Sequence, residues 1–501
     1  MISRRKFLTI GGATLLAPSL LQGCISKQSA KLPESAWQAL ARELGTNGSG
    51  TLVLPSAPSY SSLALPRNIS YAHIRPQAVA VCTSSRNVQS AIKWAAAHGI
   101  SPVPRSAAGH SYAGYSTTTG LSLDMAPINR VKFLGASPTT GDELVKIGAG
   151  ARLGVVANKL AERGLLLPIG RCATVGVAGL TLGGGFGFNS RKFGMTCDSL
   201  VETEIVVASG ERLVCNEREN ADLFWATRGG NGGTFGVNTS FTFKTQRSME
   251  NISVYRLRWE LPIKNKEAVA KVWGALQTAA ADAPNDFSLR IGLDYTPNGT
   301  IQIEGLGQYR GELAPLKEIL TPALSTQPNY QYIRTLDFAS AGRYLGSLGA
   351  PNAFYCKSAF TDNDFNDSAM NTAINWLEEL PSTTKSGSLT FFRWGGAIED
   401  TAPQATAFVH RKAQYVLEGT VCWRPGDEKS VIDNSRAWLQ EGFDKRLTNE
   451  FNGYAFQNFI DRNLQNWETA YYGENYSRLS QVKSKHDPAN LFNNAQSIRP
   501  A

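Results

Sequence analysis

The sequence GRCATVGVAGLTLGGGFG occupies residues 170–187 and is the most distinctive stretch of the chain. Its glycines are far denser than those of the flanking segments, and glycine lets a backbone approach a ligand that a Cβ would block. The Gly-x-Gly-x-x-Gly fingerprint of nicotinamide dinucleotide sites is absent from it. The stretch therefore predicts close backbone contact with a ligand and gives no support to a nicotinamide nucleotide.

A second motif, Arg105–Tyr112, reads Arg-Ser-Ala-Ala-Gly-His-Ser-Tyr and follows a predicted strand. Successive backbone N–H groups in such a loop can hold a phosphate or pyrophosphate. Residues 109–113 also approach the Gly-x-Ser-x-Gly elbow of serine hydrolases, which must lead directly into a helix. Residues 113–121 are rich in Gly, Ser and Thr, which form helices poorly, so the hydrolase is disfavoured. Taken alone, the motif also fits a plain surface loop.

The 501 residues suggest two large domains. Between residues 70 and 245 a strand at Ala78–Cys82, a helix that runs to about His98, and a strand at Ile100–Pro104 form one strand–helix–strand unit. Ser84, Ser85 or Asn87 can cap this helix and Gly99 can end it, and its inward face is expected to include Val88, Ile92 and Ala95. Further predicted elements complete an α+β domain. These are strands at Leu121–Met125, Leu144–Gly150, Leu200–Ala208 and Val237–Lys244, a helix at Val155–Gly164, and a glycine-rich turn at Gly229–Gly236.

From about residue 250 to 440 the pattern changes to longer alternating strands separated by turns such as Pro297-Asn298-Gly299. This pattern predicts a second α+β domain. Its expected strands are Ile252–Leu261, Phe287–Thr296 and Thr300–Leu306, and its expected helices are Lys266–Ala279, Leu313–Leu320 and Ala369–Glu379.

Charge and cysteine usage exclude some classes of function. The 50 basic and 41 acidic residues give a net charge of +9, but the basic residues are scattered. A nucleic-acid partner would require a dense basic stripe, so none is expected. The seven cysteines include no Cys-x-x-Cys pair, so neither zinc nor an iron–sulfur cluster is expected.

The N-terminus resembles a twin-arginine export signal, with Arg4-Arg5 followed by an apolar stretch, Leu8–Leu21, that is too short for a comfortable membrane span. Leu21-Gln22-Gly23-Cys24 resembles a lipoprotein cleavage box, although Gln22 is larger than the usual residue. Two outcomes stay open: a lipid anchor at Cys24, or ordinary cleavage. The expected location is the periplasm, either free or anchored to the membrane on its periplasmic side, after export by the twin-arginine machinery.

The glycine-rich motifs, together with Thr406–Arg411, Tyr471–Leu479, Val482-Lys483 and Asp487-Pro488, resemble the berberine bridge enzyme-like branch of the vanillyl-alcohol oxidase flavoprotein superfamily. The resemblance covers about residues 70–501. It implies an α+β fold in which a two-subdomain PCMH-type FAD-binding domain is joined to an α+β substrate domain with an antiparallel sheet. The expected segments are a signal at 1–24, a spacer and entry segment at 25–66 with one helical patch near Ser35–Leu44, the FAD-binding domain at 67–248, the substrate domain at 249–440, and a C-terminal segment at 441–501 that returns to the FAD domain.

The resemblance further implies FAD held by two covalent bonds, from His110 to the 8α-methyl carbon and from Cys172 to C6 of the flavin. Arg105 and His110 stand five positions apart rather than the family's four, so the loop is expected to bulge. The alternative for Cys172 is a buried, inert thiol. The other residues expected to contact FAD are Arg105, Ser106, Ala107, Ala108, Gly109, Ser111, Val175, Gly176, Gly179, Val237, Phe456 and Asn458.

The catalytic base departs from the usual pattern. Many relatives use a tyrosine of a Tyr-x-Asn-Tyr motif, but this chain has phenylalanine at both positions, Phe456 and Phe459. Glu418 stands five residues before a tryptophan, where berberine bridge enzyme has a glutamate base and most relatives have glutamine. We expect Glu418 to be the base, with Tyr112 or Tyr472 assisting, because burial would raise the pKa of its carboxyl. The alternative is a solvent-facing glutamate on a strand.

The implied function is oxidation of an alcohol, sugar or related small organic substrate by hydride transfer to flavin N5. Val175 and Val177 are modest in size, which favours access of O2 and therefore an oxidase. One alternative is a periplasmic dehydrogenase that passes electrons to a cytochrome or quinone. Another is a non-catalytic flavin-binding envelope protein, which the missing tyrosines would favour.

Overall fold

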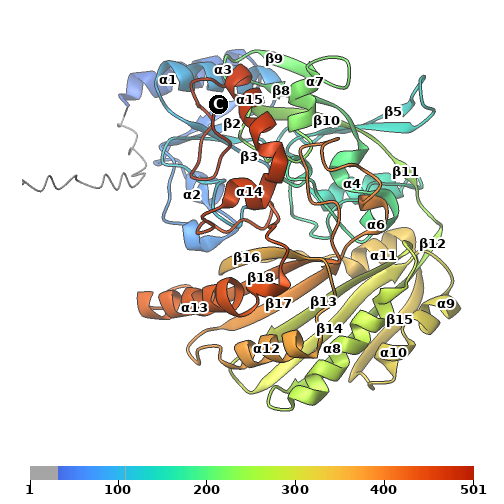
Figure 1. Cartoon of the computed structure of the whole chain (residues 1–501). Helices are drawn as coiled ribbons and strands as arrows, with labels where there is room; N and C mark the ends of the chain where they lie inside the picture. The colour runs from blue at the N-terminus through green and yellow to red at the C-terminus, as the bar shows by residue number, and fades with distance from the viewer. Residues whose placement is uncertain (1–31, 108) are drawn as a thin grey trace, which may run out of the picture.

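The computed structural model describes residues 32–107 and 109–501. The expected export signal, Cys24 and Ala108 lie outside the described residues. The described chain forms two bodies: an upper one built on two small sheets and a lower one built on a single large sheet (Figure 1). The last part of the chain returns to the upper body.

The strand–helix–strand unit near residue 80 has the local signals that the sequence predicts. Helix α3 (Ser85–Ala97) begins at Ser84, whose hydroxyl accepts a hydrogen bond from the backbone N–H of Asn87. Gly99, with φ of +64°, ends it, because that backbone conformation costs glycine little. The predicted inward face of the helix, which includes Val88 and Ile92, is completely buried.

The first small sheet contains this unit. Its strands are β1 (Thr51–Val53), β2 (Ala78–Val81), β4 (Leu121–Asp124) and β3 (Pro102–Arg105), in that order across the sheet. Strands β2 and β3 both run parallel to β4, and β1 is antiparallel to β2. As a result, β3 ends beside β4 and delivers the loop that follows Arg105 to the edge of the sheet.

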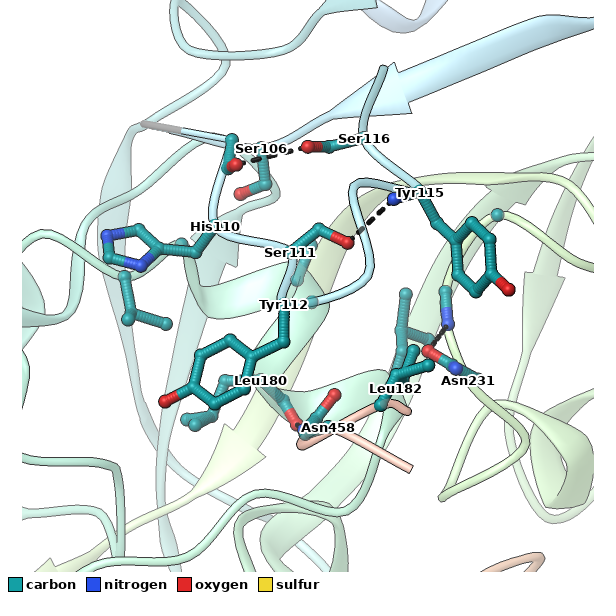
Figure 2. Close-up of a pocket in the computed structure, with 18 of the residues that line it drawn as sticks. Ser106, His110, Ser111, Tyr112, Tyr115, Ser116, Leu180, Leu182, Asn231 and Asn458 are labelled. Atoms are coloured by element: carbon teal, nitrogen blue, oxygen red, sulfur yellow. Dashed lines mark hydrogen bonds between the residues drawn. The ribbon is translucent and has the colours of Figure 1, made fainter. Parts of the chain in front are cut away.

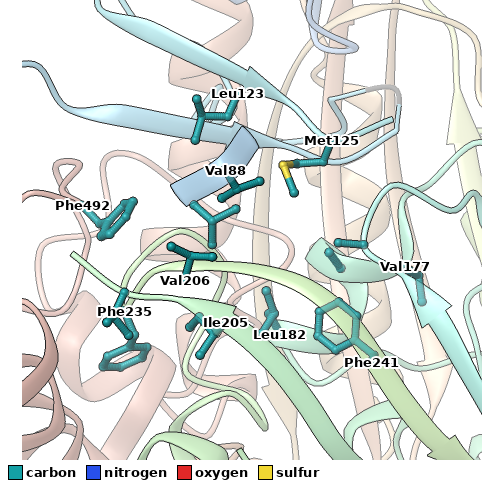
Figure 3. Close-up of a cluster of buried hydrophobic side chains, with 14 of the residues drawn as sticks. Val88, Leu123, Met125, Val177, Leu182, Ile205, Val206, Phe235, Phe241 and Phe492 are labelled. Carbon is teal, nitrogen blue, oxygen red and sulfur yellow. The ribbon is translucent and has the colours of Figure 1, made fainter. Parts of the chain in front are cut away.

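The second small sheet is antiparallel. Its order is β5 (Val131–Ala136), β6 (Glu143–Gly148), β10 (Val237–Lys244), β8 (Leu200–Val206) and β9 (Arg212–Cys215). Phe241 of β10 packs with Ile205, Val206 and Met125 in a core that also takes in Val88 of α3 (Figure 3). One hydrophobic core therefore joins both small sheets.

Short elements complete the upper body. They are α1 (Glu34–Thr46), α2 (Tyr60–Ala64), η1 (Ile69–Tyr71), α4 (Leu153–Ala161), β7 (Leu165–Leu166), α5 (Val177–Leu182), α6 (Ser190–Phe193), η2 (Thr196–Ser199), α7 (Ala221–Ala226) and β11 (Gln246–Arg247). Helix α1 packs on α3 and buries Trp37, Leu40 and Leu44 in the core. The folded body thus begins before residue 67, inside the segment expected to be a spacer.

The lower body is a seven-stranded antiparallel sheet. Its order is β15 (Tyr330–Asp337), β12 (Asn251–Pro262), β14 (Thr300–Tyr309), β13 (Phe287–Tyr295), β17 (Ser386–Arg393), β18 (Tyr415–Trp423) and β16 (Ala353–Thr361). The accompanying helices are α8 (Lys266–Ala281), α9 (Leu313–Ile319), α10 (Thr321–Leu324), α11 (Phe338–Leu345), α12 (Asp367–Glu378), η3 (Gly396–Ile398), α13 (Lys429–Glu441) and the π-helical turn η4 (Gly442–Arg446).

Helices α8 and α12 cover the lower face of this sheet, and its upper face turns toward the other body (Figure 1). Strand alternation then decides which side chains reach the upper body. Leu417 is buried in the core beneath the sheet, and a Cβ on Gly419 would collide with the ring of Phe443. Glu418 points the opposite way, in register with Ser358 and Thr390 on the neighbouring strands.

The C-terminal segment contains η5 (Thr448–Glu450), α14 (Trp467–Tyr472), η6 (Gly473–Asn475) and α15 (Tyr476–His486). Its apolar side chains, including Trp467 and Phe492, join the core of the upper body. Lys483 and Asp487 fasten it there as a completely buried ion pair, 2.7 Å apart, and Lys483 also donates to the carbonyls of Thr234 and Phe492. The Val-Lys and Asp-Pro motifs near the C-terminus are therefore structural.

None of the helices in the described residues is long and apolar enough to cross a bilayer. The six described cysteines are all free; Cys172 and Cys422 are half-buried and the other four are buried.

Candidate functional site

A cavity of about 1920 Å³ is lined by residues of both bodies and of the C-terminal segment. Typical ligand pockets measure roughly 300–1,000 Å³, so this one can hold a large cofactor together with a second molecule. His110, Cys172 and Glu418 all line it. The structure thus brings together three side chains that are far apart in the sequence.

The loop that carries His110 turns sharply. Ala107 has a φ of +38° and Gly109 a φ of +63°, and residues other than glycine rarely adopt such values. The backbone N–H of Gly109 donates to the carbonyl of Ser106 at 3.0 Å, and the Ser106 hydroxyl donates to the carbonyl of Ala149 at 2.6 Å. The extra residue between Arg105 and His110 lies in this tight turn.

Arg105 supports the loop from behind. Its guanidinium group donates to the carbonyls of Leu63 and Leu65, and a Cβ on Gly109 would collide with it. Asp124 is a further electrostatic partner, although burial lowers the pKa of Arg105. Because these bonds occupy both terminal nitrogens, Arg105 fixes the course of the loop even though it also lines the cavity.

His110 and Cys172 meet at one hydroxyl group. The Oγ1 atom of Thr174 lies 3.0 Å from Nε2 of His110 and 3.5 Å from Sγ of Cys172. Burial, together with the charges of Arg67 and Arg152, lowers the pKa of His110 to about 4. The imidazole is therefore neutral near pH 7 and has a free lone pair for a nucleophilic role.

A loop of the lower body closes over this pair. The Leu348 carbonyl accepts hydrogen bonds from the Thr174 hydroxyl at 2.8 Å and from Arg67 at 2.9 Å. A Cβ on Gly349 would lie 3.0 Å from the Cys172 sulfur and 3.8 Å from Cε1 of His110. Thr174 lies in the glycine-rich stretch, but no local pattern indicated its contacts or the roles of Leu348 and Gly349, because these depend on contacts between distant segments.

The glycine-rich stretch lies against the loop as a backbone cradle. A Cβ on Gly176 would come within 2.1 Å of the Ser106 hydroxyl, whereas a Cβ on Gly179 would meet no atom at all. Both glycines line the cavity, at the start of α5. The close packing at Gly176 and the open backbone at Gly179 fit the approach of an extended cofactor such as FAD.

Most of the other residues expected to contact FAD line the same cavity. These are Ser106, Gly109, Ser111, Val175, Val237, Phe456 and Asn458. Ala107 is buried close to Gly176 and is outside the described lining. Figure 2 shows His110 and Tyr112 extending from one loop, with Tyr112 on the side where Leu180 and Asn458 lie. Asn458 donates to the Leu180 carbonyl at 3.1 Å, which ties the C-terminal segment to α5.

Glu418 forms the polar centre of the lower side of the cavity. Its carboxyl accepts a hydrogen bond from the Thr420 hydroxyl at 3.3 Å and shares another with Tyr112. Burial raises the pKa of the Glu418 carboxyl, although Arg290, the two hydrogen bonds and Arg171 oppose that rise. A carboxylate with a raised pKa in a cavity suits proton abstraction near neutral pH.

Aromatic rings surround Tyr112 and the two phenylalanines that replace the usual tyrosines. The Tyr112 ring stacks on Phe459 at 5.2 Å and meets the edge of Phe354. Phe456 is buried against Phe186, with ring centres 5.4 Å apart. Burial and the neighbouring Glu418 raise the pKa of Tyr112 far above its ordinary value, so Tyr112 acts as a hydrogen-bond donor.

Tyr472 does not belong to this group. It is buried in α14 among Trp467 and Tyr476, bonds to Asn231, and lies outside the lining of the cavity as described. Val177 is likewise buried in the core, whereas Val175 lines the cavity. The expectation that Tyr472 assists Glu418 is therefore wrong, because Tyr472 lies away from the cavity. Of the two tyrosines, only Tyr112 reaches Glu418.

The remaining sequence motifs hold the two bodies together. Arg411, almost completely buried, makes a two-pronged ion pair with Asp198 at 2.7 and 2.8 Å. The side-chain amide of Asn475 donates to the carbonyls of Thr406 and Ala407. The motifs at 406–411 and 471–479 thus interlock. No cluster of three or more metal-binding side chains occurs within residues 32–107 and 109–501.

Two family models match the chain. One, described as an FAD binding domain, covers residues 76–216, and one described as berberine and berberine like covers residues 455–499. The first contains His110 and Cys172, and the second contains Phe456 and Asn458. Both matches therefore fall on segments that line the cavity.

Curated relatives and solved structures match over nearly the whole chain. The uncharacterized FAD-linked oxidoreductase YgaK of Bacillus subtilis is 32% identical over 464 residues, which are 91% of this chain and 98% of its own. Xylooligosaccharide oxidase of Thermothelomyces thermophilus is 29% identical and covers 85% of this chain and 88% of its own. The structure of BBE-like 1 from Physcomitrella patens matches with a TM-score of 0.81 and 27% identity, covering 93% of this chain and 99% of its own.

Proposed function

Because the chain belongs to the berberine bridge enzyme-like family of FAD-dependent oxidoreductases, we propose that it carries FAD bound covalently at both His110 and Cys172 and oxidises a hydroxyl group of a small organic substrate. Saccharides are the first class to test, since xylooligosaccharide and chitooligosaccharide oxidases are among the relatives. The observation that carries the proposal is that Glu418 lines the same cavity as His110 and Cys172.

In the proposed reaction, different residues of the cavity bind the cofactor and take the proton of the substrate. His110 and Cys172, aligned by Thr174, would hold the flavin ring, and the backbone of residues 105–107, 109–111 and 176–179 would hold the rest of the cofactor. FAD bound there would supply a two-electron oxidant for the substrate. Glu418 takes the hydroxyl proton of the substrate onto its carboxylate, and Tyr112 orients that carboxylate through its hydrogen bond. The aromatic wall around Tyr112 keeps water from the reacting groups.

Denaturation tests the two covalent bonds. Acid-precipitated wild-type protein is expected to remain yellow, and each single variant, His110→Ala and Cys172→Ala, is expected to stay yellow through the remaining bond. The double variant is expected to release its flavin to the supernatant. Cys422→Ala is the matched control, because Cys422 is half-buried but lies outside the described lining of the cavity. Free flavin from denatured wild-type protein would refute the double attachment.

Rapid mixing with substrate tests the base. Glu418→Gln is expected to reduce its flavin about 10²–10⁴ times more slowly than wild type, which is the usual effect of losing a general base. Glu260→Gln, exposed on β12, controls for the change of charge. An unchanged rate of flavin reduction in Glu418→Gln would exclude this role. A flavin that no substrate reduces would instead favour the non-catalytic binding protein.

For the electron acceptor we propose O2, since Val175, which lines the cavity, is modest in size and leaves room for O2. Photoreduced protein exposed to air is expected to reoxidise within seconds and to produce peroxide. Slow reoxidation in air combined with rapid transfer to a dye would support the dehydrogenase that serves a cytochrome or quinone.

We further propose export by the twin-arginine route, from the Arg4-Arg5 motif and the apolar stretch behind it. Cell fractionation of a host with and without that translocase tests it, and retention of mature protein in the cytoplasm of the intact host would contradict it. The Cys24→Ser variant separates a lipid-anchored periplasmic protein from a free one, because only the anchored form would move from the membrane to the soluble fraction.

A further inference from the structure

The cavity is strongly cationic. Eight arginine side chains line it, and Glu418 is the only carboxylate side chain in the described part of its lining. Two of these arginines stand close to Glu418: Arg290, on strand β13 of the sheet that carries Glu418, and Arg171, the residue before Cys172. Both act electrostatically on the Glu418 carboxyl.

The charge of Arg290 is incompletely neutralised. It donates to Glu304 at 3.3 Å and to the Thr390 hydroxyl at 3.3 Å. Glu304 also forms ion pairs with Arg258 at 2.8 Å and with Arg256 at 3.4 Å. One largely buried carboxylate therefore faces three guanidinium groups and leaves an excess of positive charge. Asp294, the other carboxylate of β13, also interacts electrostatically with Arg290 but lies outside the described lining of the cavity. With Asp294 counted, two carboxylates still face three guanidinium groups.

Arg171 adds to this excess. Its side chain donates to the carbonyl of Leu345 at 3.3 Å, and in the described structure no carboxylate lies within ion-pair distance of it. Burial and the charges of Arg290 and Arg256 lower the pKa of Arg171 to about 10, so it still carries its proton at pH 7. Two charged guanidinium groups that repel each other at the wall of a cavity would be stabilised by an anion bound to both.

We propose that Arg290 and Arg171 bind a carboxylate group of the substrate, so that the preferred substrate is a hydroxy acid such as a uronic acid unit. This rests on the proposed function, because it places the carboxylate beside the base, Glu418. The loop and the glycine-rich stretch proposed to hold FAD belong to the upper body, whereas Arg290 stands on the sheet of the lower body, which leaves Arg290 free for a group of the substrate. The planar, forked donors of arginine match a carboxylate well.

The test uses pairs of ligands that differ only in charge. Galacturonate is compared with its methyl ester, and 4-(hydroxymethyl)benzoate with its methyl ester, which separates saccharide from aromatic hydroxy acids. Binding is measured from perturbation of the flavin absorption spectrum and by calorimetry, which need no turnover. In wild type at least one acid is expected to bind roughly tenfold or more tightly than its ester, as a charge-assisted pair would give.

Arg290→Gln and Arg171→Gln are each expected to lose that preference while binding of the ester stays within about twofold, since only a charge-assisted contact is removed. Glu304 keeps Arg256 and Arg258 in the first variant, and the second loses only a bond to a carbonyl, so both are expected to fold. Arg334→Gln, exposed on β15, is the matched control and should keep the preference. Arg290→Lys should keep part of the preference for the acid, because lysine retains the positive charge but lacks the forked pair of donors of a guanidinium group.

Two results would overturn the proposal. The first is equal or weaker binding of both acids relative to their esters in wild type. The second is an equal loss for acid and ester in the arginine variants, which would mean that the arginines only adjust the pKa of Glu418. If the acids are oxidised no better than their esters, and neither arginine variant changes the oxidation of the acids, this proposal fails and the proposed function stands. If the acids bind through the arginines but no compound reduces the flavin, the proposed function fails and the carboxylate site stands.

Discussion

The Tyr112 hydroxyl and the Glu418 carboxyl share a hydrogen bond, although Tyr112 belongs to a loop of the upper body and Glu418 to a strand of the lower one. The bond crosses from one body to the other inside the cavity that both line. Tyr112 is held for this contact by its stacking on Phe459 and its edge contact with Phe354. Glu418 and Tyr112 therefore form a pair only when the two bodies are joined.

Removing this hydrogen bond is expected to change the pH profile. Tyr112→Phe takes away a contact that lowers the pKa of Glu418, so that pKa should rise further. Since the carboxylate is the active form, the acid limb of kcat/KM should move to higher pH, with most activity recovered at alkaline pH. The profile of flavin reduction against pH measures this. An acid limb that stays in place would show that the bond has no effect on the base.

Thr174→Val is expected to delay covalent attachment without preventing FAD binding. The variant keeps the volume of the side chain but removes the hydroxyl that lies against His110 and Cys172 and donates to Leu348. Attachment is followed as the fraction of flavin that stays with acid-precipitated protein over time. Thr278→Val, exposed on α8, is the control. Identical time courses for the two variants would contradict the positioning role.

Ala107→Gly is expected to stabilise the protein. A left-handed backbone costs residues with a Cβ roughly 1–2 kcal/mol, and Ala107 has a φ of +38°. Glycine also gains freedom in the unfolded chain, so the net gain should be below about 1 kcal/mol. Ala136→Gly, exposed on β5, should instead destabilise the protein slightly. The melting temperatures of the two variants, each compared with wild type, test this prediction. A shift in the same direction for both variants would show that the backbone at Ala107 is not strained.

Replacing each of two lysines of α15 by methionine should lower the free energy of unfolding by very different amounts. Lys483→Met leaves Asp487 buried without its partner, which typically costs about 3–5 kcal/mol of the free energy of unfolding. Lys485→Met breaks an exposed pair with Asp222, for which about 0–1 kcal/mol is usual. Chemical denaturation of both variants measures the difference. Similar losses would show that the buried pair is not what holds the C-terminal segment.

Local sequence signals predicted much of this arrangement. The strand at Val237–Lys244 matches residue for residue, and the cap at Ser84 and the stop at Gly99 bound α3 as expected. His110, Cys172, Glu418 and Tyr112 meet in one cavity, because motif spacing carries information about which segments converge. Spacing alone, however, does not tell which face of an element a side chain occupies.

What the sequence did not predict follows from the fact that motif spacing does not tell which way a side chain faces. Tyr472 lies in a helix whose consecutive aromatic residues are all buried, so its position in a motif said nothing about the cavity. The Arg105 side chain lines the cavity as expected, but it also donates to the Leu63 and Leu65 carbonyls, which are distant in sequence. Helix α1 confirms the helical pattern near Ser35–Leu44, but composition did not indicate that its buried residues would dock on the core. Each of these depends on tertiary contacts rather than on local pattern.

The loop of residues 346–350 gives the attachment site a built-in order of assembly. The Leu348 carbonyl and the backbone of Gly349 reach Thr174, Cys172 and His110 only after the large sheet has formed and docked. A chain in which the lower body is unfolded or undocked lacks one wall of the site. Covalently bound flavin would then report completed folding, because it could form only in molecules whose two bodies have already docked.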